Sequence, residues 1–154
     1  MDQARVINAL AAILLEEGDY LRAQEQFEYA QTIAREYEAH QLEGRALRGL
    51  GDVAGRMHKF DEAEQYYQKA LAIAIVLEIR AERCAVLHHL GDLYAMQNHN
   101  PEALEAWVQS LAYDRRLDHP KRQQLQKQVN EFVEEHHLEE AYQKFCEQYG
   151  LQIT

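Results

Sequence analysis

The residues of this sequence that could do chemistry are histidines and carboxylates in two short stretches. His88 and Asp92 are four residues apart in "HHLGD", and "EEHHLEE" places two more histidines among glutamates between Glu134 and Glu140. Imidazole and carboxylate groups bind Zn²⁺, but protein zinc sites use three or four ligands. Adjacent histidines on a helix point about 100° apart, so only His88 and Asp92 form a properly spaced couple. The sequence therefore predicts no metal site and no cofactor.

The other familiar catalytic patterns are missing from the sequence. It has no glycine-rich phosphate loop, no nucleophile elbow and no HExxH motif. Its one serine, Ser110, occupies a position where a small residue packs in related segments of the chain. Cys84 and Cys146 have no CxxC partner and are too few for a disulfide framework, which indicates buried, reduced thiols in the cytoplasm. We therefore expect a cytoplasmic protein that is not an enzyme.

Composition indicates a helical and acidic protein. Among 154 residues there are two prolines and seven glycines, and Ala, Leu, Glu and Gln are abundant, as is typical of helices. The net charge of -10 at pH 7 opposes binding to nucleic acid or to an anionic membrane, because both attract clustered Lys and Arg. The apolar stretch "VINALAAILL" is too short to span a bilayer. We expect one all-α domain over residues 1–154, with neither nucleic acid nor membrane as a partner.

Segments of similar sequence recur at a constant spacing, starting at Leu10, Leu50 and Leu90. In this register the segments share an aromatic residue, which is Phe27, Tyr67 and Trp107 in turn. Each segment is predicted to form two helices joined by a polar turn, namely "EEGDY", "MHKFD" and "NHNPE". The expected caps of the second helices are Asp19, Asp61 and Asn100, with Pro101 at a first helical position.

These segments resemble the tetratricopeptide repeat, whose pattern runs W-x2-L-G-x2-Y, then A-x3-F, then A, then P. "LRGLGDVA" and "LHHLGDLY" fit its first half, and "AQEQFEYA", "AEQYYQKA" and "ALEAWVQS" fit its second half. The expected units are 4–43, 44–83, 84–120 and a degenerate capping unit, 121–150. Units of about 40 residues rather than 34 resemble the long-unit variety found in regulatory and scaffold proteins.

The resemblance implies a right-handed α-solenoid of antiparallel helix pairs whose first helices line a concave groove. Such a groove binds a peptide or helix of another protein, so the resemblance implies a scaffold or adaptor. Transferring the groove positions of the family to this sequence gives Arg5, Asn8, Arg45, Arg48, Asp52, Arg56, His88, Asp92 and Met96. Arginine side chains bind carboxylates with two donors, which favours an acidic peptide. The alternative is that these are solvated side chains joined by weak ion pairs.

The stretch "ALAIAIVLEI" from Ala70 is apolar at nearly every position. Ile73 and Leu77 match apolar residues in the other units, including Tyr37 and Leu117, and are expected in the core. Ile75 and Val76 instead match charged residues, which are Arg35, Glu36, Arg115 and Arg116. With Ile79 they form either a self-association patch that makes a homodimer or a region buried by mid-stack packing. The first possibility supports an alternative function: a ligand-sensing or self-association segment of a larger bacterial-type signalling regulator.

Overall fold

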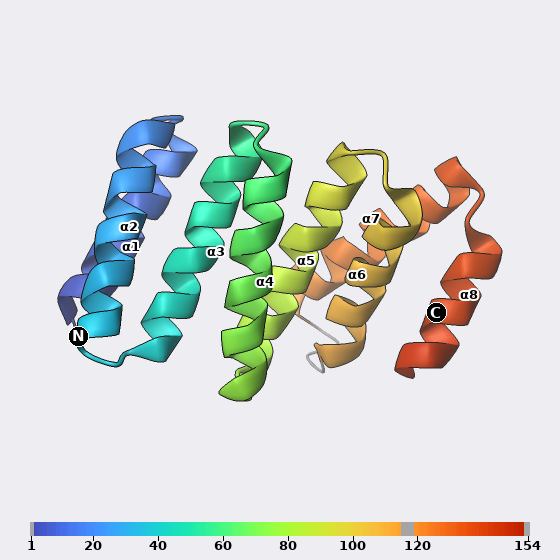
Figure 1. The fold of residues 1–154 in the computed structure, drawn as a ribbon. Coiled ribbons are helices and arrows are strands. Elements are labelled where there is room, and N and C mark those ends of the chain that lie inside the picture. Colours follow the sequence, from blue (N-terminus) through green and yellow to red (C-terminus); the bar gives the residue numbers. More distant parts are fainter. Residues whose placement is uncertain (1, 115–118, 153–154) are drawn as a thin grey trace. The chain divides into compact units, whose positions relative to one another are not determined.

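The structure is a computed structural model that describes residues 2–114 and 119–152 (Figure 1). Within these ranges it contains eight α-helices and no strand: α1 (Asp2–Glu16), α2 (Tyr20–Glu36), α3 (His40–Arg56), α4 (Phe60–Val76), α5 (Arg80–Met96), α6 (Asn100–Tyr113), α7 (Pro120–His136) and α8 (Glu139–Tyr149). None of these helices is both long and apolar enough to cross a membrane. The chain divides into two compact units, Met1–Glu82 and Arg83–Thr154, which are described separately below as unit 1 and unit 2.

Three-residue connections join successive helices from α1 to α6. Their middle residues have left-handed φ angles between 51° and 81° and recur at a constant spacing, at positions 18, 38, 58, 78 and 98. In the first connection the N–H of Gly18 donates to the carbonyl of Leu15 at 3.1 Å, and the N–H of Asp19 donates to that of Leu14 at 2.9 Å. These two bonds form a Schellman motif, which satisfies the carbonyl groups at the end of a helix. Each repeat of the sequence therefore contains two equal structural steps, and each step is one helix with its connection.

The start of α2 and the start of α6 agree with the sequence. The carboxylate of Asp19 accepts a hydrogen bond from the N–H of Arg22 at 3.3 Å, so Asp19 caps α2 as expected. Pro101 lies in the first turn of α6, where no intrahelical N–H donor is needed.

The two other expected caps are wrong. Lys59 precedes α4 and His99 precedes α6, and neither makes a side-chain capping bond. Asp61 therefore lies inside the first turn of α4, and Asn100 is the first residue of α6. The cause is the Schellman motif: its left-handed residue reverses the chain so sharply that the next helix begins only two positions later.

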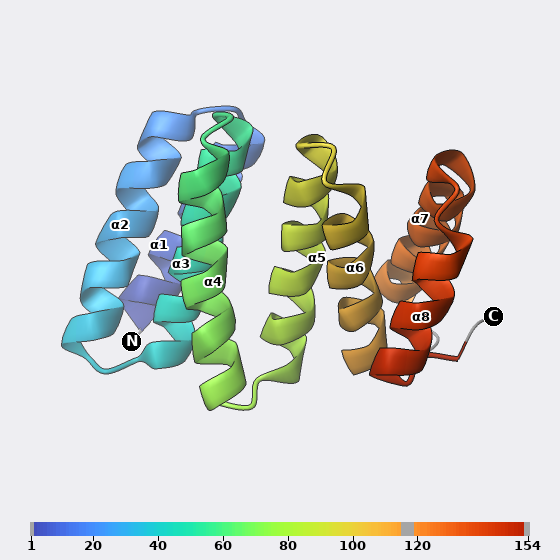
Figure 2. The ribbon, with the colours of Figure 1, turned by 45° about the vertical axis from the view of Figure 1, so that its right-hand side comes forward.

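In unit 1, α1, α2 and α3 all contact one another, and α3 also contacts α4 (Figures 1 and 2). Its core contains two clusters of apolar side chains from α1, α2 and α3. These are Ala11, Leu14, Leu15, Ala23, Phe27, Leu50 and Val53, and then Ala4, Ile7, Ala30, Ile33 and Ala46. Close approach of α3 and α4 depends on Gly51, because a Cβ atom there would lie 2.6 Å from the Tyr67 ring.

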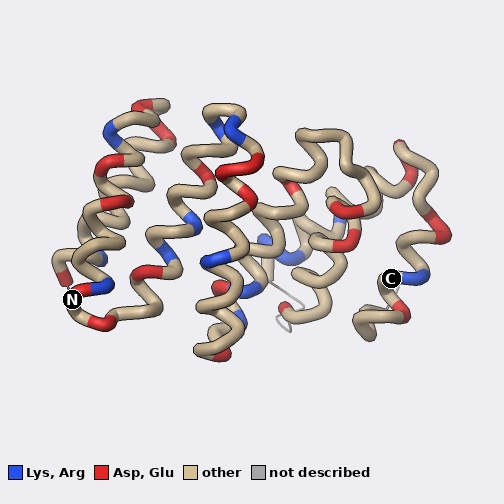
Figure 3. Tube along the Cα trace, viewed as in Figure 1, with Lys and Arg blue, Asp and Glu red and all other residues tan. Residues whose placement is uncertain are grey.

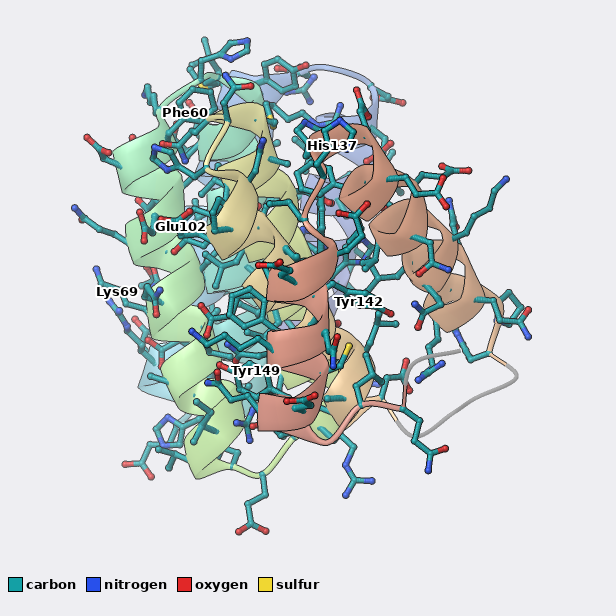
Figure 4. All side chains as sticks on the ribbon, turned by 90° about the vertical axis from the view of Figure 1, so that its right-hand side faces the viewer. Phe60, Lys69, Glu102, His137, Tyr142 and Tyr149 are labelled. Carbon is teal, nitrogen blue, oxygen red and sulfur yellow. The ribbon has the colours of Figure 1, made fainter. Side chains whose placement is uncertain are left out.

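Unit 2 packs α6 against α7 and α8. Trp107 of α6 is buried in its core and contacts the ring of Phe132 edge to face, with 4.9 Å between ring centroids. A Cβ atom at Gly91 of α5 would clash with the indole ring. The helix pair α7 and α8 corresponds to the degenerate fourth segment, and Tyr142 of α8 packs into the same core (Figure 4).

Two residues expected in the core of unit 1 are exposed. Ile33 is buried and Ile73 is half-buried, but Tyr37 is 65% exposed and Leu77 is 39% exposed. The prediction for Tyr37 and Leu77 is wrong because both are C-cap residues, one position beyond the helical face that enters the core. Their expected counterpart Leu117, like the neighbouring Arg115 and Arg116, lies outside the described residues.

Candidate functional site

Two arginines of α3 converge on one carboxylate in unit 1. Arg45 Nε donates to Glu82 Oε1 at 2.8 Å, and Arg48 Nε lies 3.4 Å from Glu82 Oε2. Arg45 and Arg48 are three residues apart and therefore share a helix face. The Glu82 side chain is only 16% exposed, whereas that of Arg45 is 42% exposed. The α3 face thus binds a carboxylate of its own chain and keeps a guanidinium group accessible to another.

The remaining predicted arginines make weaker contacts. Arg5 Nη2 lies 3.2 Å from Asp2 Oδ1, and Arg56 Nη2 lies 3.9 Å from Glu16 Oε1. All four side chains are more than half exposed. Water and salt screen such pairs, which typically stabilise a protein by about 0–1 kcal/mol. A competing carboxylate could therefore displace either partner at little cost.

Asn8 has a structural role in this face. Its Nδ2 atom donates to the carbonyl oxygen of Leu42 at 3.2 Å, which ties α1 to α3. Its Oδ1 atom is buried and accepts no hydrogen bond from the described residues. The side chain of Asn8 is half-buried, so it positions α1 more than it offers a contact to a ligand.

The two predicted aspartates are held by aromatic donors at the same repeat positions. In unit 1 the phenol of Tyr67 donates to Asp52 Oδ1 at 2.6 Å. In unit 2 the indole Nε1 of Trp107 donates to Asp92 Oδ1 at 3.1 Å. Each carboxylate thus links the first helix of a pair to the buried aromatic residue of the second. Asp52 and Asp92 are positioned by the fold, and both remain half-buried.

This pairing can be recognised in the sequence when two positions of each segment are compared together. The first segment has Phe27 at the aromatic position, and Ala12 stands where the later segments have Asp52 and Asp92. Phenylalanine offers no N–H or O–H donor, and alanine has no acceptor to receive one. The carboxylate therefore appears only where the aromatic residue can donate.

His88 and Asp92 come together in unit 2 as the sequence predicts. His88 Nε2 lies 3.7 Å from Asp92 Oδ2, and Gln128 of α7 donates to Asp92 Oδ1 at 3.1 Å. Burial lowers the pKa of His88 below its usual value, and the Asp92 carboxylate only partly opposes this effect. His88 is therefore largely neutral at pH 7. Gln128 was not predicted, because the fourth segment departs from the repeat pattern that located the other residues.

The apolar residues at the end of α4 are mostly exposed. Ile75 is 46% exposed and Val76 is 79% exposed, whereas Ile79 is half-buried in the next connection. This differs from the alternative in which packing buries all three. Met96, the last residue of α5, is also exposed. Ile75 and Val76, with the adjacent Leu77, are called the α4 patch below.

Charged and metal-binding groups are otherwise dispersed. Lys and Arg occur along α3, and acidic residues occur in both units (Figure 3). Over residues 2–114 and 119–152, no three or more His, Cys, Asp or Glu side chains come close enough to hold a metal ion. Cys84 and Cys146 are buried thiols, and the Ser110 hydroxyl donates to the carbonyl of Cys84 at 2.8 Å.

Comparisons with known proteins agree with this geometry. Residues 2–75 match a family model described as tetratricopeptide repeat. Among solved structures, the chain is similar to the crystal structure of BtubC (BKLC) from P. vanneervenii, with a TM-score of 0.76 and 19% sequence identity. That match covers 96% of this chain and 61% of the BtubC chain, and at this identity it shows the fold alone. None of the curated proteins matches the chain significantly. The predicted all-α solenoid fold of paired helices is therefore confirmed.

Proposed function

We propose, on the premise that residues 2–75 are tetratricopeptide repeats, that the chain is a non-catalytic module that binds an acidic segment of another protein. Repeats of this family generally mediate contacts between proteins. In this proposal the first helices of unit 1 supply the binding surface, and Arg45 and Arg48 are its central residues. Arg5 and Arg56 extend the surface, while Asn8 and Asp52 position its side chains. His88 and Asp92 are the predicted binding residues of unit 2 and are considered within that unit alone.

The observation that supports the proposal most is the convergence of Arg45 and Arg48 on Glu82. Guanidinium groups in this arrangement match the geometry of a carboxylate. Glu82 supplies one carboxylate from within the chain, and Arg45 still has a large part of its surface exposed. A carboxylate of a partner segment would bind to the same pair of side chains, in addition to Glu82 or in competition with it.

Titration of a fluorescent polyglutamate peptide at low salt tests the proposal. Arg45→Gln removes one accessible guanidinium and should weaken binding about fivefold, which corresponds to ~1 kcal/mol for one exposed charge pair. Glu82→Gln removes the internal competitor and should tighten binding by a similar factor. Circular dichroism establishes that both variants remain folded during the titration.

Each variant has a control with the same change in net charge. Arg22→Gln removes an exposed guanidinium from α2, and Glu25→Gln removes an exposed carboxylate from the same helix. Neither should change the affinity by as much as its counterpart on the α3 face. If Arg22→Gln weakened binding as much as Arg45→Gln, the peptide would be attracted to net charge alone, and the proposed site would be wrong.

Exposure of the α4 patch favours a second candidate function, which is self-association of a segment of a larger signalling regulator. Aliphatic side chains at Ile75 and Val76 replace the charged Arg35 and Glu36 of the first segment, so the fold does not need them there. Light scattering across a wide concentration range should then show a homodimer that Ile75→Arg with Val76→Arg converts to a folded monomer. A monomeric parent chain would remove this candidate.

The proposed setting of the module is the cytoplasm, as one repeat domain over residues 1–154. Cys84 and Cys146 are buried thiols, which supports this location because extracellular domains commonly use cysteines in disulfides.

A further inference from the structure

Helix α1 has a second apolar face that the described residues of unit 1 leave largely exposed. Val6, Leu10 and Ile13 are 66%, 46% and 56% exposed. They are four and three residues apart, so they line one side of the helix. The core side of α1 uses other residues, among them Ile7, Ala11 and Leu14. A helix at the surface of a soluble protein normally turns a polar face to water, and we call this exception the α1 face.

The repeat register shows what such a face does elsewhere in unit 1. The counterparts of Val6, Leu10 and Ile13 on α3 are Ala46, Leu50 and Val53, and all three are buried. The preceding helix pair covers them. Leu50 and Val53 belong to a cluster with Leu14 and Phe27, and Ala46 belongs to a cluster with Ile7, Ala30 and Ile33. The same side of a first helix is therefore an established contact with a helical hairpin.

Unit 2 shows that the pattern is general. Val86, Leu90 and Leu93 occupy the same register positions on α5, and all three are buried. These positions are thus apolar in three successive segments and exposed only in α1. Isolated surface aliphatic residues need no explanation, but three in register with buried counterparts do.

Asp2 adds a charge to this comparison. It is in register with Glu82, the carboxylate bound by Arg45 and Arg48 of the preceding first helix. The Asp2 side chain is 93% exposed and has only the exposed Arg5 as its ion-pair partner among the contacts described. A hairpin packed on the α1 face in the same geometry would bring a basic side chain to Asp2.

From these observations we infer that the α1 face binds a helical hairpin of another polypeptide, packed as a preceding repeat would be. The inner side of that hairpin carries aliphatic and aromatic residues against Val6, Leu10 and Ile13, and it presents an Arg or Lys to Asp2. A second copy of this chain is a poor occupant, because the exposed residues of its last helix, α8, are all polar: Glu139, Glu140, Gln143, Lys144, Glu147 and Gln148.

The test uses this chain's own first hairpin as the probe. A duplicate of the segment from Met1 to His40, placed directly before Met1 of the full chain, keeps the repeat register. The duplicate contains the side chains that cover α3 in unit 1, and its Arg5 copy can reach Asp2. Urea unfolding followed by circular dichroism should show a higher midpoint than that of the parent chain, together with added helical signal.

Leu10→Arg in the original α1 separates contact at this face from any other effect of the added hairpin. In the parent chain this change should leave the urea midpoint nearly unchanged, because Leu10 is half-exposed there. In the duplicated chain it should abolish the gain in the midpoint. Val76→Arg, an equally drastic change at an exposed site of unit 1, should preserve the gain.

Three results would overturn the proposal. One is a duplicated chain whose midpoint equals that of the parent. Another is a gain that persists after Leu10→Arg, because the hairpin would then pack elsewhere. The third comes from light scattering on the parent chain: a dimer that Leu10→Arg dissociates would assign the α1 face to a second copy, whereas a monomer supports the hairpin.

Discussion

The first helices of the two units differ in charge at one equivalent position. Arg48 in unit 1 and His88 in unit 2 occupy the same place in successive repeats. Arg48 belongs to a basic pair that binds Glu82, whereas His88 is largely neutral at pH 7 and lies beside the carboxylate of Asp92. Because Asp52 is the counterpart of Asp92, the two units differ at the Arg48 position, which is cationic in unit 1 and largely uncharged in unit 2.

What stays constant between the units is the packing behind those charges. Gly51 lies against Tyr67 in unit 1, and Gly91 lies against Trp107 in unit 2. In both units the buried aromatic residue also donates a hydrogen bond to an aspartate of the first helix. The comparison teaches that the repeat fixes the aromatic contact, whereas the charge at the Arg48 and His88 position can differ between units.

The largest expected effect on stability comes from removing the buried aromatic residue that both units share. Trp107→Ala deletes a fully buried indole that contacts Phe132 and Gly91, and it should destabilise the protein by about 3–5 kcal/mol. Urea unfolding followed by circular dichroism measures the loss. Trp107→Phe keeps an aromatic ring and should cost clearly less. A loss below about 1 kcal/mol for Trp107→Ala would contradict the view that this contact organises unit 2.

The next effect concerns the charges that differ between the units. Glu82→Gln leaves the guanidinium groups of Arg45 and Arg48 without their shared carboxylate. Charge-assisted hydrogen bonds typically stabilise a protein by about 1.5–3 kcal/mol, and partial exposure of Arg45 places this variant at the lower end, near ~1.5 kcal/mol. Unfolding at low and high salt measures the change. Glu25→Gln on α2 is the matched control, with an expected change within about 0.5 kcal/mol. Equal losses would mean that the Glu82 pair has no special role.

The fold could be predicted from the sequence because its signals recur. The repeat register places Phe27, Tyr67 and Trp107 at equivalent positions, and all three are buried. The helix starts at Phe60 and Asn100 could not be predicted in the same way, because a left-handed connection rather than a capping side chain determines them. Backbone hydrogen bonds in the connection determine where the helix begins, and such bonds depend little on residue type.

The candidate site was predictable only in part. Arg45 and Arg48 follow from the family's groove positions, but their partner Glu82 does not, because its counterparts Asp2 and Leu42 share no common chemistry with each other. A contact that occurs in only one repeat cannot be recognised by comparing equivalent positions of successive repeats. The same reason explains why the α1 face emerges only when exposure in the structure is compared between equivalent helices.

A smaller effect is expected from the aromatic hydrogen bond of unit 1. Tyr67→Phe removes the phenol that donates to Asp52 and leaves the packed ring in place. The variant has the same aromatic residue as the first segment, where Phe27 occupies this position. It differs from that segment because Asp52 is still present but no longer accepts the phenol hydrogen bond. The expected loss is about 1 kcal/mol in urea unfolding. Tyr37→Phe, at an exposed position, should change nothing measurable. If both variants were equally stable, the aspartate–aromatic bond would be incidental to the repeat.

The smallest effect concerns Tyr149 of α8 in unit 2 (Figure 4). Its phenol donates to Glu105 Oε1 at 2.6 Å and accepts from Gln109 Nε2 at 3.0 Å. Burial and this bond to a carboxylate raise the pKa of Tyr149 to about 12, above its ordinary value near 10. The folded state thus favours the protonated phenol.

The sign of the resulting pH dependence follows from that shift. Stability from this bond is fully present below about pH 10 and is lost as the pH rises through about 12, because the unfolded chain releases its proton first. Urea unfolding at about pH 9 and about pH 11 should therefore show a larger loss for the parent chain than for Tyr149→Phe. Ultraviolet titration of the phenolates in both proteins provides the independent measurement, since the variant should lack the last group to ionise. Identical pH dependence in the two proteins would show that Tyr149 is not held to Glu105, and that α6 and α8 of unit 2 depend on apolar packing alone.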